Sequence, residues 1–298
     1  MKNKTKDTLA FFGFASPWII GFIGLLIIPI GSSLVLSFTK WDILTPPTWV
    51  GLQNYIEIFN DPLFYKSLRV TLTYTLFSVP LTVVIAFFVA LLLNTKVKGI
   101  NVYRTIFYLP AVISGVAVAL LWAWIFNPEF GLINNILIKI GIEGPRWIYD
   151  EAWVMPSLII MSLWGVGGGV ILYLAGLQGI PKDLYEAATL DGVNWWHKLI
   201  YITLPSMSPI ILFTTITGII AALQTFTQAY IMTSGGPNHA SLFYVYYIYS
   251  HAFRWYKMGT ACALAWIFFV IVFVISMIAL KVASKFVYYE AREGGEIL

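Results

Sequence analysis

The sequence predicts an all-α integral membrane protein with six transmembrane helices, and three observations lead to that prediction. First, 59% of the 298 residues are hydrophobic and only 11% are charged, whereas a soluble domain carries about 25% charged residues. Second, the apolar residues gather in six runs that are long enough to cross a bilayer as helices. Third, none of these runs contains Lys, Arg, Asp or Glu. A chain of this composition needs the bilayer as its solvent, because one water-soluble core cannot hide so much apolar surface.

The predicted spans lie at residues 9–38, 71–93, 105–126, 153–178, 205–232 and 259–280. They form one transmembrane domain over residues 9–285, between short tails at 1–8 and 286–298. The three lysines before the first span are also typical of a signal peptide. The apolar run that follows them is too long for a signal peptide and has no convincing cleavage site beside it. We therefore expect a first span that is retained.

The placement of Lys and Arg predicts the orientation of the chain. If the N-terminus is cytoplasmic, segments 1–8, 94–104, 179–204 and 281–298 lie inside and hold 11 of the 18 basic residues. The three outer segments are longer in total and hold the other 7. Because Lys and Arg accumulate in cytoplasmic segments, both termini are predicted to be cytoplasmic.

Two spans carry unusual residues. Residues 164–169, Trp-Gly-Val-Gly-Gly-Gly, predict either very close helix packing or a bent helix that lines a pathway. In the fifth span, Gln224 and Gln228 are four residues apart and should share one helix face. Because an unsatisfied amide among lipid tails costs several kcal/mol in order of magnitude, this face should meet either other helices or a watery cavity. Both alternatives stay open at this point.

The outer segments show helix signals of their own. Trp122, Trp124 and Phe126 precede Asn127-Pro128, which predicts an interfacial aromatic belt followed by a helix end. Residues 49–59 space their apolar side chains as a short amphipathic helix. Asp61 then predicts a helix N-cap in front of Pro62.

Several chemistries lack their motifs. The sequence contains no phosphate-binding Gly-x-x-x-x-Gly-Lys-[Ser/Thr] loop, and His197, His239 and His251 are scattered, so we expect no nucleotide, metal or other cofactor site and no catalytic set. No ionisable residue lies within a span, which leaves no obvious proton relay. A transporter of this kind would need an energy source in a partner protein.

The polar stretch 179–205 reads as helix, turn, helix. Pro181 suits the first turn of a helix, and Gly192 suits the left-handed position after it. Asn194 can cap a second helix over residues 195–203, before Pro205. Leu184, Ala187, Ala188 and Leu190 can form the apolar face of the first helix, and Trp196, Leu199 and Ile200 or Ile202 are expected to face inward on the second.

This stretch also resembles a known motif. Glu186-Ala187-Ala188, with Gly192 and then Ile202-x-Leu204-Pro205, resembles the EAA loop of bacterial ATP-binding-cassette (ABC) importer permeases. Val193 and Leu199 depart from the commonest pattern and remain apolar. Three further stretches are similar to the carbohydrate-uptake branch, the permeases of maltose and glycerol-phosphate type: Val50-Gly51-Leu52-x-Asn54-Tyr55, Arg104-x-x-Phe107-Tyr108-Leu109-Pro110 and Gly235-Gly236-Pro237.

The resemblance implies a type I ABC importer permease in the bacterial cytoplasmic membrane, which is a transport subunit and not an enzyme. It implies that the loop at 179–205 couples to a partner ATPase, with the contact formed by Glu186, Ala187, Ala188, Asp191, Gly192, Leu204 and Pro205. The partners it implies are two copies of the ATPase, a second and different permease, and an extracytoplasmic sugar-binding protein. Membrane lipid surrounds such a subunit, and no nucleic acid takes part.

Uncharged spans that are rich in Trp, Tyr, Gln and Thr suit an uncharged, hydroxyl-rich ligand such as a sugar, because aromatic faces stack on C–H surfaces and amides bind hydroxyls. The candidates for the substrate pathway are Trp164, Tyr173, Gln224, Gln228 and Tyr230. Packing within the protein explains each of them equally well. The alternative function is a self-sufficient, ion-coupled secondary carrier, which the uncharged spans and the loop at 179–205 disfavour.

Overall fold

The computed structural model describes residues 2–95 and 97–284, with the backbone alone at residues 2–7 and 9. The predicted tail at 286–298 lies outside the described residues. The chain divides into two compact units, one built from residues 1–64 and 247–270 and the other from residues 65–246 and 271–298. Each unit is described by itself below.

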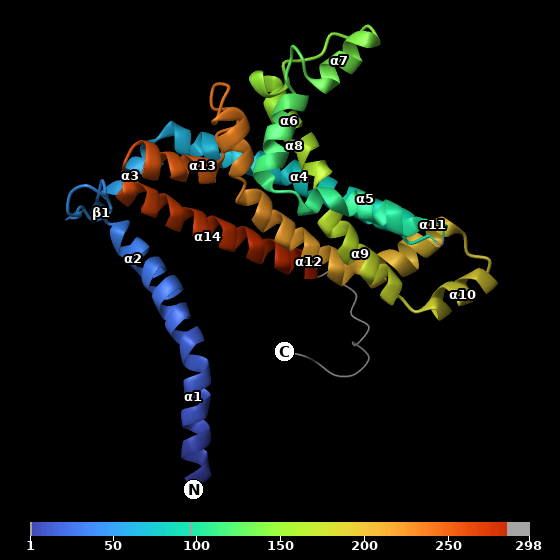
Figure 1. The fold of residues 1–298 in the computed structure, drawn as a ribbon, viewed down its shortest axis with the longest axis horizontal. Helices are drawn as coiled ribbons and strands as arrows, with labels where there is room; N and C mark the ends of the chain where they lie inside the picture. Colours follow the sequence, from blue (N-terminus) through green and yellow to red (C-terminus); the bar gives the residue numbers. More distant parts are fainter. Residues whose placement is uncertain (1, 96, 285–298) are drawn as a thin grey trace. The chain divides into compact units, whose positions relative to one another are not determined.

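Helices dominate both units (Figure 1). In chain order, the first elements are α1 (Lys2–Phe22), η1 (Ile23–Ile27), α2 (Ile28–Leu36), β1 (Thr39–Lys40), β2 (Thr48–Trp49), α3 (Gln53–Asn60), α4 (Pro62–Leu93), α5 (Ile100–Val112), α6 (Gly115–Ile125) and α7 (Leu132–Lys139). There follow η2 (Trp147–Tyr149), α8 (Glu151–Trp164), α9 (Gly167–Gly179), α10 (Lys182–Leu190), α11 (Trp195–Lys198), η3 (Leu199–Thr203), α12 (Leu204–Leu223), η4 (Ala229–Thr233), α13 (Tyr244–Tyr249), η5 (Ser250–Arg254) and α14 (Met258–Ala283). The antiparallel pair of two-residue strands sets Thr39 opposite Trp49.

Each of the six predicted windows falls on a helix or a pair of helices that is long and apolar enough to cross a membrane. Four are single stretches, at Ala10–Leu36, Pro62–Leu93, Trp195–Leu223 and Met258–Ala283. The other two are bent pairs, α5 with α6 at 98° and α8 with α9 at 46°. The all-α fold is therefore confirmed.

Two windows differ in detail from the predicted spans. The third is interrupted at Ile113 and Ser114, whose ψ angles of 139° and 133° are extended rather than helical. The helix of the fifth span, α12, ends at Leu223 rather than near residue 232, because Thr225 and Phe226 leave the helical conformation. Hydropathy cannot register either break, since it measures the transfer of side chains and not the continuity of the backbone.

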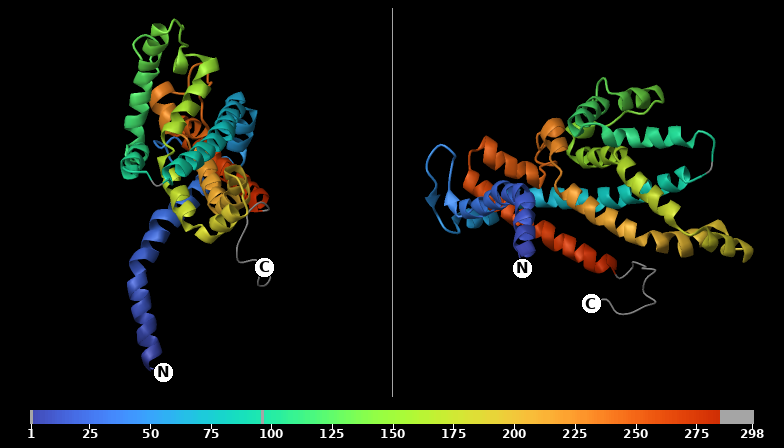
Figure 2. Two further views of the ribbon diagram at one scale, coloured as in Figure 1. Left: turned by 90° about the vertical axis from the view of Figure 1, so that its right-hand side faces the viewer. Right: turned by 60° about the horizontal axis from the view of Figure 1, so that its bottom comes forward.

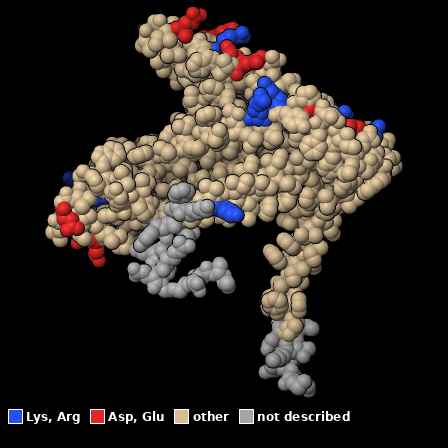
Figure 3. All heavy atoms as spheres, turned by 180° about the vertical axis from the view of Figure 1, so that it is seen from behind, with Lys and Arg blue, Asp and Glu red and all other residues tan. Residues whose placement is uncertain are grey.

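Figure 3 shows one face of the molecule on which charged side chains lie in small groups, separated by broad uncharged surface. Many large apolar side chains are exposed among the described residues, for example Phe14 at 89%, Leu25 at 84% and Leu92 at 70%. Exposed apolar area of this extent is foreign to a soluble monomer and is expected of helices that lipid surrounds.

In the first unit, Asn54 joins three distant segments. Its Nδ2 donates to the carbonyl oxygens of Ser37 (2.8 Å) and Thr39 (2.9 Å), and its Oδ1 accepts from the Thr260 hydroxyl at 3.2 Å. Asp61 caps α4 as predicted, because its Oδ1 accepts from the Leu63 N–H at 2.8 Å. The amphipathic helix expected within residues 49–59 is α3.

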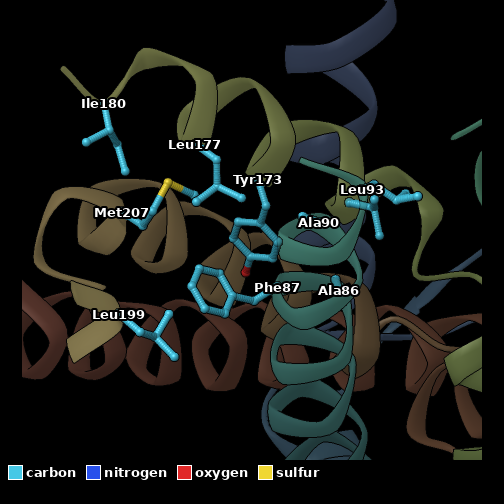
Figure 4. Packing of buried hydrophobic residues seen from close by; sticks show 10 residues of the cluster. Ala86, Phe87, Ala90, Leu93, Tyr173, Leu177, Ile180, Leu199 and Met207 are labelled. Atoms are coloured by element: carbon cyan, nitrogen blue, oxygen red, sulfur yellow. The ribbon is translucent and has the colours of Figure 1, made fainter. Parts of the chain in front are cut away.

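The core of the second unit lies between α4, α9 and the start of α12, which Figure 4 shows at close range. Phe87 of α4 meets the ring of Tyr173 of α9 edge to face, with centroids 5.8 Å apart. Figure 2 shows α9 and α12 side by side. A Cβ at Gly176 would lie only 2.2 Å from the Cδ1 of Ile210, so a larger residue there would require the Ile210 side chain to shift. Packing of small and large side chains is the main attraction between helices in lipid.

Aromatic rings fill another part of the second unit. Phe126 packs on Trp122 (5.0 Å between centroids) and on Trp147 (5.3 Å). Trp122 and Phe126 are only 9% and 0% exposed and pack within the unit, whereas Trp124 is 49% exposed, and the interfacial belt stays a prediction. Rings from later in the chain supply further contacts, Trp164 to Trp122 and Trp147 to Phe126, which local spacing could not show.

Arg104 closes the end of α4. Its Nε and Nη2 donate to the Leu93 carbonyl oxygen at 3.3 and 3.0 Å. The last carbonyls of a helix have no partner within the helix and carry partial negative charge. A half-buried guanidinium therefore satisfies the α4 end and ties α5 to it.

Candidate functional site

The polar stretch 179–205 forms a helical hairpin, as predicted. Helix α10 begins after Pro181, which occupies the N-cap rather than the first helical turn. Asn194 caps α11, and its Oδ1 accepts from the His197 N–H at 3.0 Å. From α11 the chain runs through η3 into α12 without leaving a helical conformation, so the hairpin is a direct extension of an apolar helix.

Gly192 forms the turn between the two helices. It has φ +73°, a conformation that glycine adopts without strain and other residues rarely adopt. The Gly192 N–H donates to the Thr189 carbonyl at 3.1 Å, and the Val193 N–H donates to the Ala188 carbonyl at 2.9 Å. This pair of bonds is the Schellman motif, which closes the C-terminus of a helix. The predicted left-handed glycine is therefore confirmed.

Side-chain contacts fix the hairpin to the core of the second unit. The hydroxyls of Tyr185 and Thr203 lie 2.9 Å apart, and Lys198 Nζ donates to the Thr189 hydroxyl at 2.8 Å. Leu199 is buried in the cluster formed by α4, α9 and α12, and Tyr185 packs against that cluster. The hairpin is thus packed onto the transmembrane helices and is not a loose loop.

The tip of the hairpin is exposed. The exposed residues at the tip are Glu186, Ala187, Asp191 and Gly192, whereas Ala188 is buried. At the far end of the motif, Leu204 is exposed and Pro205 is half-buried. Trp196 was predicted to face inward and is 61% exposed, and Leu190, on the predicted apolar face of the first helix, is 90% exposed. The inward position of Trp196 is wrong because it assumed that an apolar helix face must be covered by the same chain. The tip is therefore a partly apolar projection whose exposed surface is suited to contact with a protein partner.

The second candidate site is a cavity of about 590 Å³ within the second unit. We call it the hydroxyl-lined cavity. Its polar lining comes from α4, α8, α9, α12 and the residues after α12, and consists of Tyr74, Ser78, Thr82, Ser162, Trp164, Tyr173, Thr214, Thr217, Thr225 and Gln228. None of the described residues that line it is charged. Cavities of this size accommodate small organic ligands.

Three of the five pathway candidates lie at this cavity. Trp164, Tyr173 and Gln228 line it, and the Tyr173 hydroxyl bonds to Thr214. Gln224 and Tyr230 do not line it. The prediction that Gln224 and Gln228 share one helix face is wrong, because Gln224 is the C-cap of α12 and the helix is interrupted before Gln228.

Sequence reasoning missed the contribution of α4. The buried Ser78 hydroxyl lines the cavity and has no hydrogen-bond partner among the described residues. A signal was present, because Thr71, Thr75, Ser78 and Thr82 recur every three or four residues and so mark one face of an apolar helix. Polar side chains on such a face seek other helices or a cavity rather than lipid.

The glycines of residues 164–169 serve both predicted purposes. The bend of 46° lies here, and Gly165 and Gly169 line the cavity. Gly167 provides the close packing: a Cβ there would lie 2.3 Å from the Phe107 carbonyl oxygen of α5, whereas a Cβ at Gly168 would meet nothing within 4 Å.

This difference gives a direct prediction. Gly167→Ala is expected to lower the midpoint of thermal unfolding, because overpacking against backbone costs about 1–3 kcal/mol. Gly168→Ala, one position along the same helix, should be neutral or slightly stabilising, since alanine is the better helix former. Circular dichroism of the purified protein in detergent measures both. Equal midpoints for the two variants would show that α5 and α9 do not pack this closely.

Within the described residues, no three His, Cys, Asp or Glu side chains come together as metal ligands. The arrangement is an uncharged cavity among apolar helices, with a rigid hairpin that continues one of them. These features are expected of a membrane permease that works with partners.

The chain belongs to the family of binding-protein-dependent transport system inner membrane components, whose profile matches residues 64–288. It is therefore a multi-pass inner-membrane subunit of an ABC importer that depends on a binding protein, and it is a transport subunit rather than an enzyme. The predicted family is confirmed.

The chain is similar to other proteins over almost its whole length. It is 44% identical to the "Probable ABC transporter permease protein YesP" of Bacillus subtilis (strain 168), over 97% of this chain and 94% of that protein. It is 35% identical to the lactose transport system permease protein LacF of Rhizobium radiobacter, over 94% and 93%. The fold matches a chain of the bacterial alginate ABC transporter in complex with an alginate pentasaccharide-bound periplasmic protein, with a TM-score of 0.83 and 25% identity over 95% of this chain and 96% of that chain.

Proposed function

We propose that the chain forms half of the translocation pathway of an ATP-driven importer of uncharged sugars, and that the sugar passes through the hydroxyl-lined cavity. The lining of this cavity carries the proposal. It combines hydroxyls, the Gln228 amide and the Trp164 and Tyr173 rings with no charged residue. Hydroxyls and amides hydrogen-bond to sugar hydroxyls, and aromatic rings stack on sugar C–H faces. The similar lactose permease supports the same substrate class.

The hairpin of α10 and α11 is the part that we assign to energy coupling. In this proposal both termini and the hairpin are cytoplasmic, and the exposed tip around Glu186 docks on one of two ATPase subunits. The tip is anchored to α4, α9 and α12 through the buried cluster, and these same helices line the hydroxyl-lined cavity. A movement of the hairpin by the ATPase would therefore be transmitted to the cavity. A second permease completes the pathway, and a binding protein delivers the sugar from outside.

The test is reconstitution of the assembled importer. The chain is purified by an affinity tag together with the ATPase and permease that accompany it, and is placed in proteoliposomes that contain ATP. Uptake of radiolabelled neutral mono- to pentasaccharides is then measured with the binding protein outside. We expect accumulation that stops when ATP or the binding protein is omitted. Accumulation of sugar by the chain alone under an ion gradient would show a secondary carrier instead, and no uptake of any neutral saccharide would overturn the assigned substrate class.

A further inference from the structure

The first unit contains a second cavity, of about 350 Å³, that the proposed pathway does not use. We call it the β1–α3 cavity. One wall is formed by β1 and the residues after it, another by α3, and the third by the segment between η5 and the first turn of α14. All of its lining residues belong to the first unit, whereas the hydroxyl-lined cavity belongs to the second.

The base of the β1–α3 cavity is held rigidly. Buried Asn54 links the ends of α2, β1 and α14 through the three hydrogen bonds described above. The Met258 N–H donates to the Trp41 carbonyl at 2.9 Å. A Cβ at Gly259 would lie 1.9 Å from the Thr39 carbonyl, so backbone meets backbone here. The backbone that frames the cavity is therefore fixed by the fold.

Aromatic side chains are presented at one wall of this cavity. Trp255 is 48% exposed, yet its ring is held edge to face by His251, with centroids 4.6 Å apart. His251 is itself buried against Tyr247, and burial lowers the pKa of its imidazole. The imidazole that contacts Trp255 is therefore uncharged at neutral pH. Tyr256 has φ +53°, a conformation that is uncommon outside glycine and costs of order 1 kcal/mol or more. The chain thus keeps strain that places two adjacent aromatic residues at the cavity.

The polar lining is balanced in charge. Lys40 and Lys257 are matched by Asp42 and Glu57. Hydrogen bonds from the side chain and the backbone N–H of Thr45 hold the pKa of Asp42 below its usual range, so this carboxylate is ionised at neutral pH. A site for a free cation or anion would carry an excess of the opposite charge. Equal numbers of the two signs favour a neutral ligand that both donates and accepts hydrogen bonds.

The α3 wall is also ordered before any ligand arrives. Gln53 Nε2 donates to Glu57 Oε1 at 2.9 Å, so an amide and a carboxylate lie side by side on one helix face. Planar groups of these two kinds can each bind two neighbouring hydroxyls of a sugar ring. The Gln53 amide and the Glu57 carboxylate on one wall, and the aromatic rings on another, form an arrangement that is typical of carbohydrate sites. Such a site has a stacking surface and separate hydrogen-bonding groups.

We propose that the β1–α3 cavity is a second carbohydrate-binding site, which holds one or two neutral sugar rings outside the translocation pathway. Trp255 and Tyr256 provide the stacking surface, and Gln53 and Glu57 bind the hydroxyls. The site stands whether or not the hydroxyl-lined cavity transports the same sugar. In the proposed orientation it faces the outer side of the membrane, where a sugar first meets the permease.

The experiment measures binding to the assembled complex in detergent, without the binding protein, by saturation-transfer NMR with glucose, lactose and maltotriose. Gln228→Leu is present throughout, so that the hydroxyl-lined cavity is impaired. We expect binding of at least one probe that is weakened about tenfold or more by Trp255→Ala, the loss expected for one stacked ring and its packing. Glu57→Ala, a change on an exposed helix face, should weaken it similarly without disturbing the fold. Trp124→Ala, which removes an equally exposed tryptophan elsewhere, is the matched control and should bind as the parent does.

Three results would overturn the proposal. One is that none of the three probes binds, and another is that Trp124→Ala weakens binding as much as Trp255→Ala does. The third is that Trp255→Ala and Glu57→Ala leave probe binding unchanged and, in a separate pull-down with the binding protein added, weaken only the association of that protein, which would make the cavity a contact for it. Loss of ATP-driven uptake with this binding intact would instead count against the proposed function alone.

Discussion

Gly192→Val is expected to abolish ATP-driven sugar uptake in the reconstituted importer while the complex remains assembled in the membrane. Gly192 adopts φ +73° at the tip of the hairpin, and a non-glycine residue in this region costs roughly 1–2 kcal/mol. The strain is relieved by opening the Schellman turn that joins α10 to α11. The exposed tip then loses the shape with which, in our proposal, it fits the ATPase. Uptake of labelled sugar and the ATPase activity of the same proteoliposomes are the two measurements.

The chain supplies a matched control in Gly141. This residue ends α7 with φ +80°, and the Gly141 and Ile142 N–H groups bond to Ile138 at 3.0 Å and Leu137 at 2.9 Å, which is the same motif. A Cβ would meet nothing within 4 Å at either glycine. Gly141→Val therefore introduces the same local strain outside the hairpin. If both variants lose uptake equally, the loss reflects folding and not coupling.

Glu186→Ala tests the contribution of the Glu186 side chain independently of the turn at Gly192. The residue is exposed on α10, and alanine is a good helix former, so the hairpin should keep its fold. We expect weaker retention of the ATPase during purification and uptake reduced at least about tenfold, which corresponds to one charge-assisted contact. Full retention of the ATPase with normal uptake would remove Glu186 from the interface.

The hairpin could be predicted from the sequence because its determinants are local. Gly192 and Asn194 act on residues within one turn of themselves, so their types and spacing were sufficient. The outward position of Leu190 and Trp196 could not be predicted in the same way. An amphipathic pattern says which face is apolar, and it does not say whether the same chain or a partner covers that face.

Features that depend on long-range contacts were not accessible from the sequence. The β1–α3 cavity exists because Asn54 meets Thr260, far along the chain. Trp122 and Phe126 are buried where rings from later in the chain meet them, Trp164 at Trp122 and Trp147 at Phe126. The length and low polarity of the six apolar runs predicted the helices correctly, because those properties act within each helix. The break in the third run at Ile113 and Ser114 was missed, because it changes the backbone conformation without changing the hydropathy.

Gln228→Leu should reduce sugar uptake about tenfold or more, whereas Gln224→Leu should leave it nearly unchanged. Both substitutions keep the volume of the side chain and remove one amide from the same part of the chain. Only Gln228 lines the hydroxyl-lined cavity. Removing its amide leaves a sugar hydroxyl without a partner in a confined space, at a cost of about 1–3 kcal/mol. Gln224 is exposed at the end of α12, so its leucine variant is the matched control for expression, insertion and assembly.

Initial uptake rates over a range of sugar-loaded binding protein distinguish the possible causes. If Gln228 binds the sugar in transit, the maximal rate falls, while the concentration of binding protein at half the maximal rate and the presence of the ATPase are unchanged. If Gln228 only holds helices together, the uptake rates of Gln228→Leu and Gln224→Leu should be equal when the two variants are compared at matched thermal stability. A fall confined to Gln224→Leu would place the route on the exposed side of α12, and the hydroxyl-lined cavity would then be a packing defect rather than a passage.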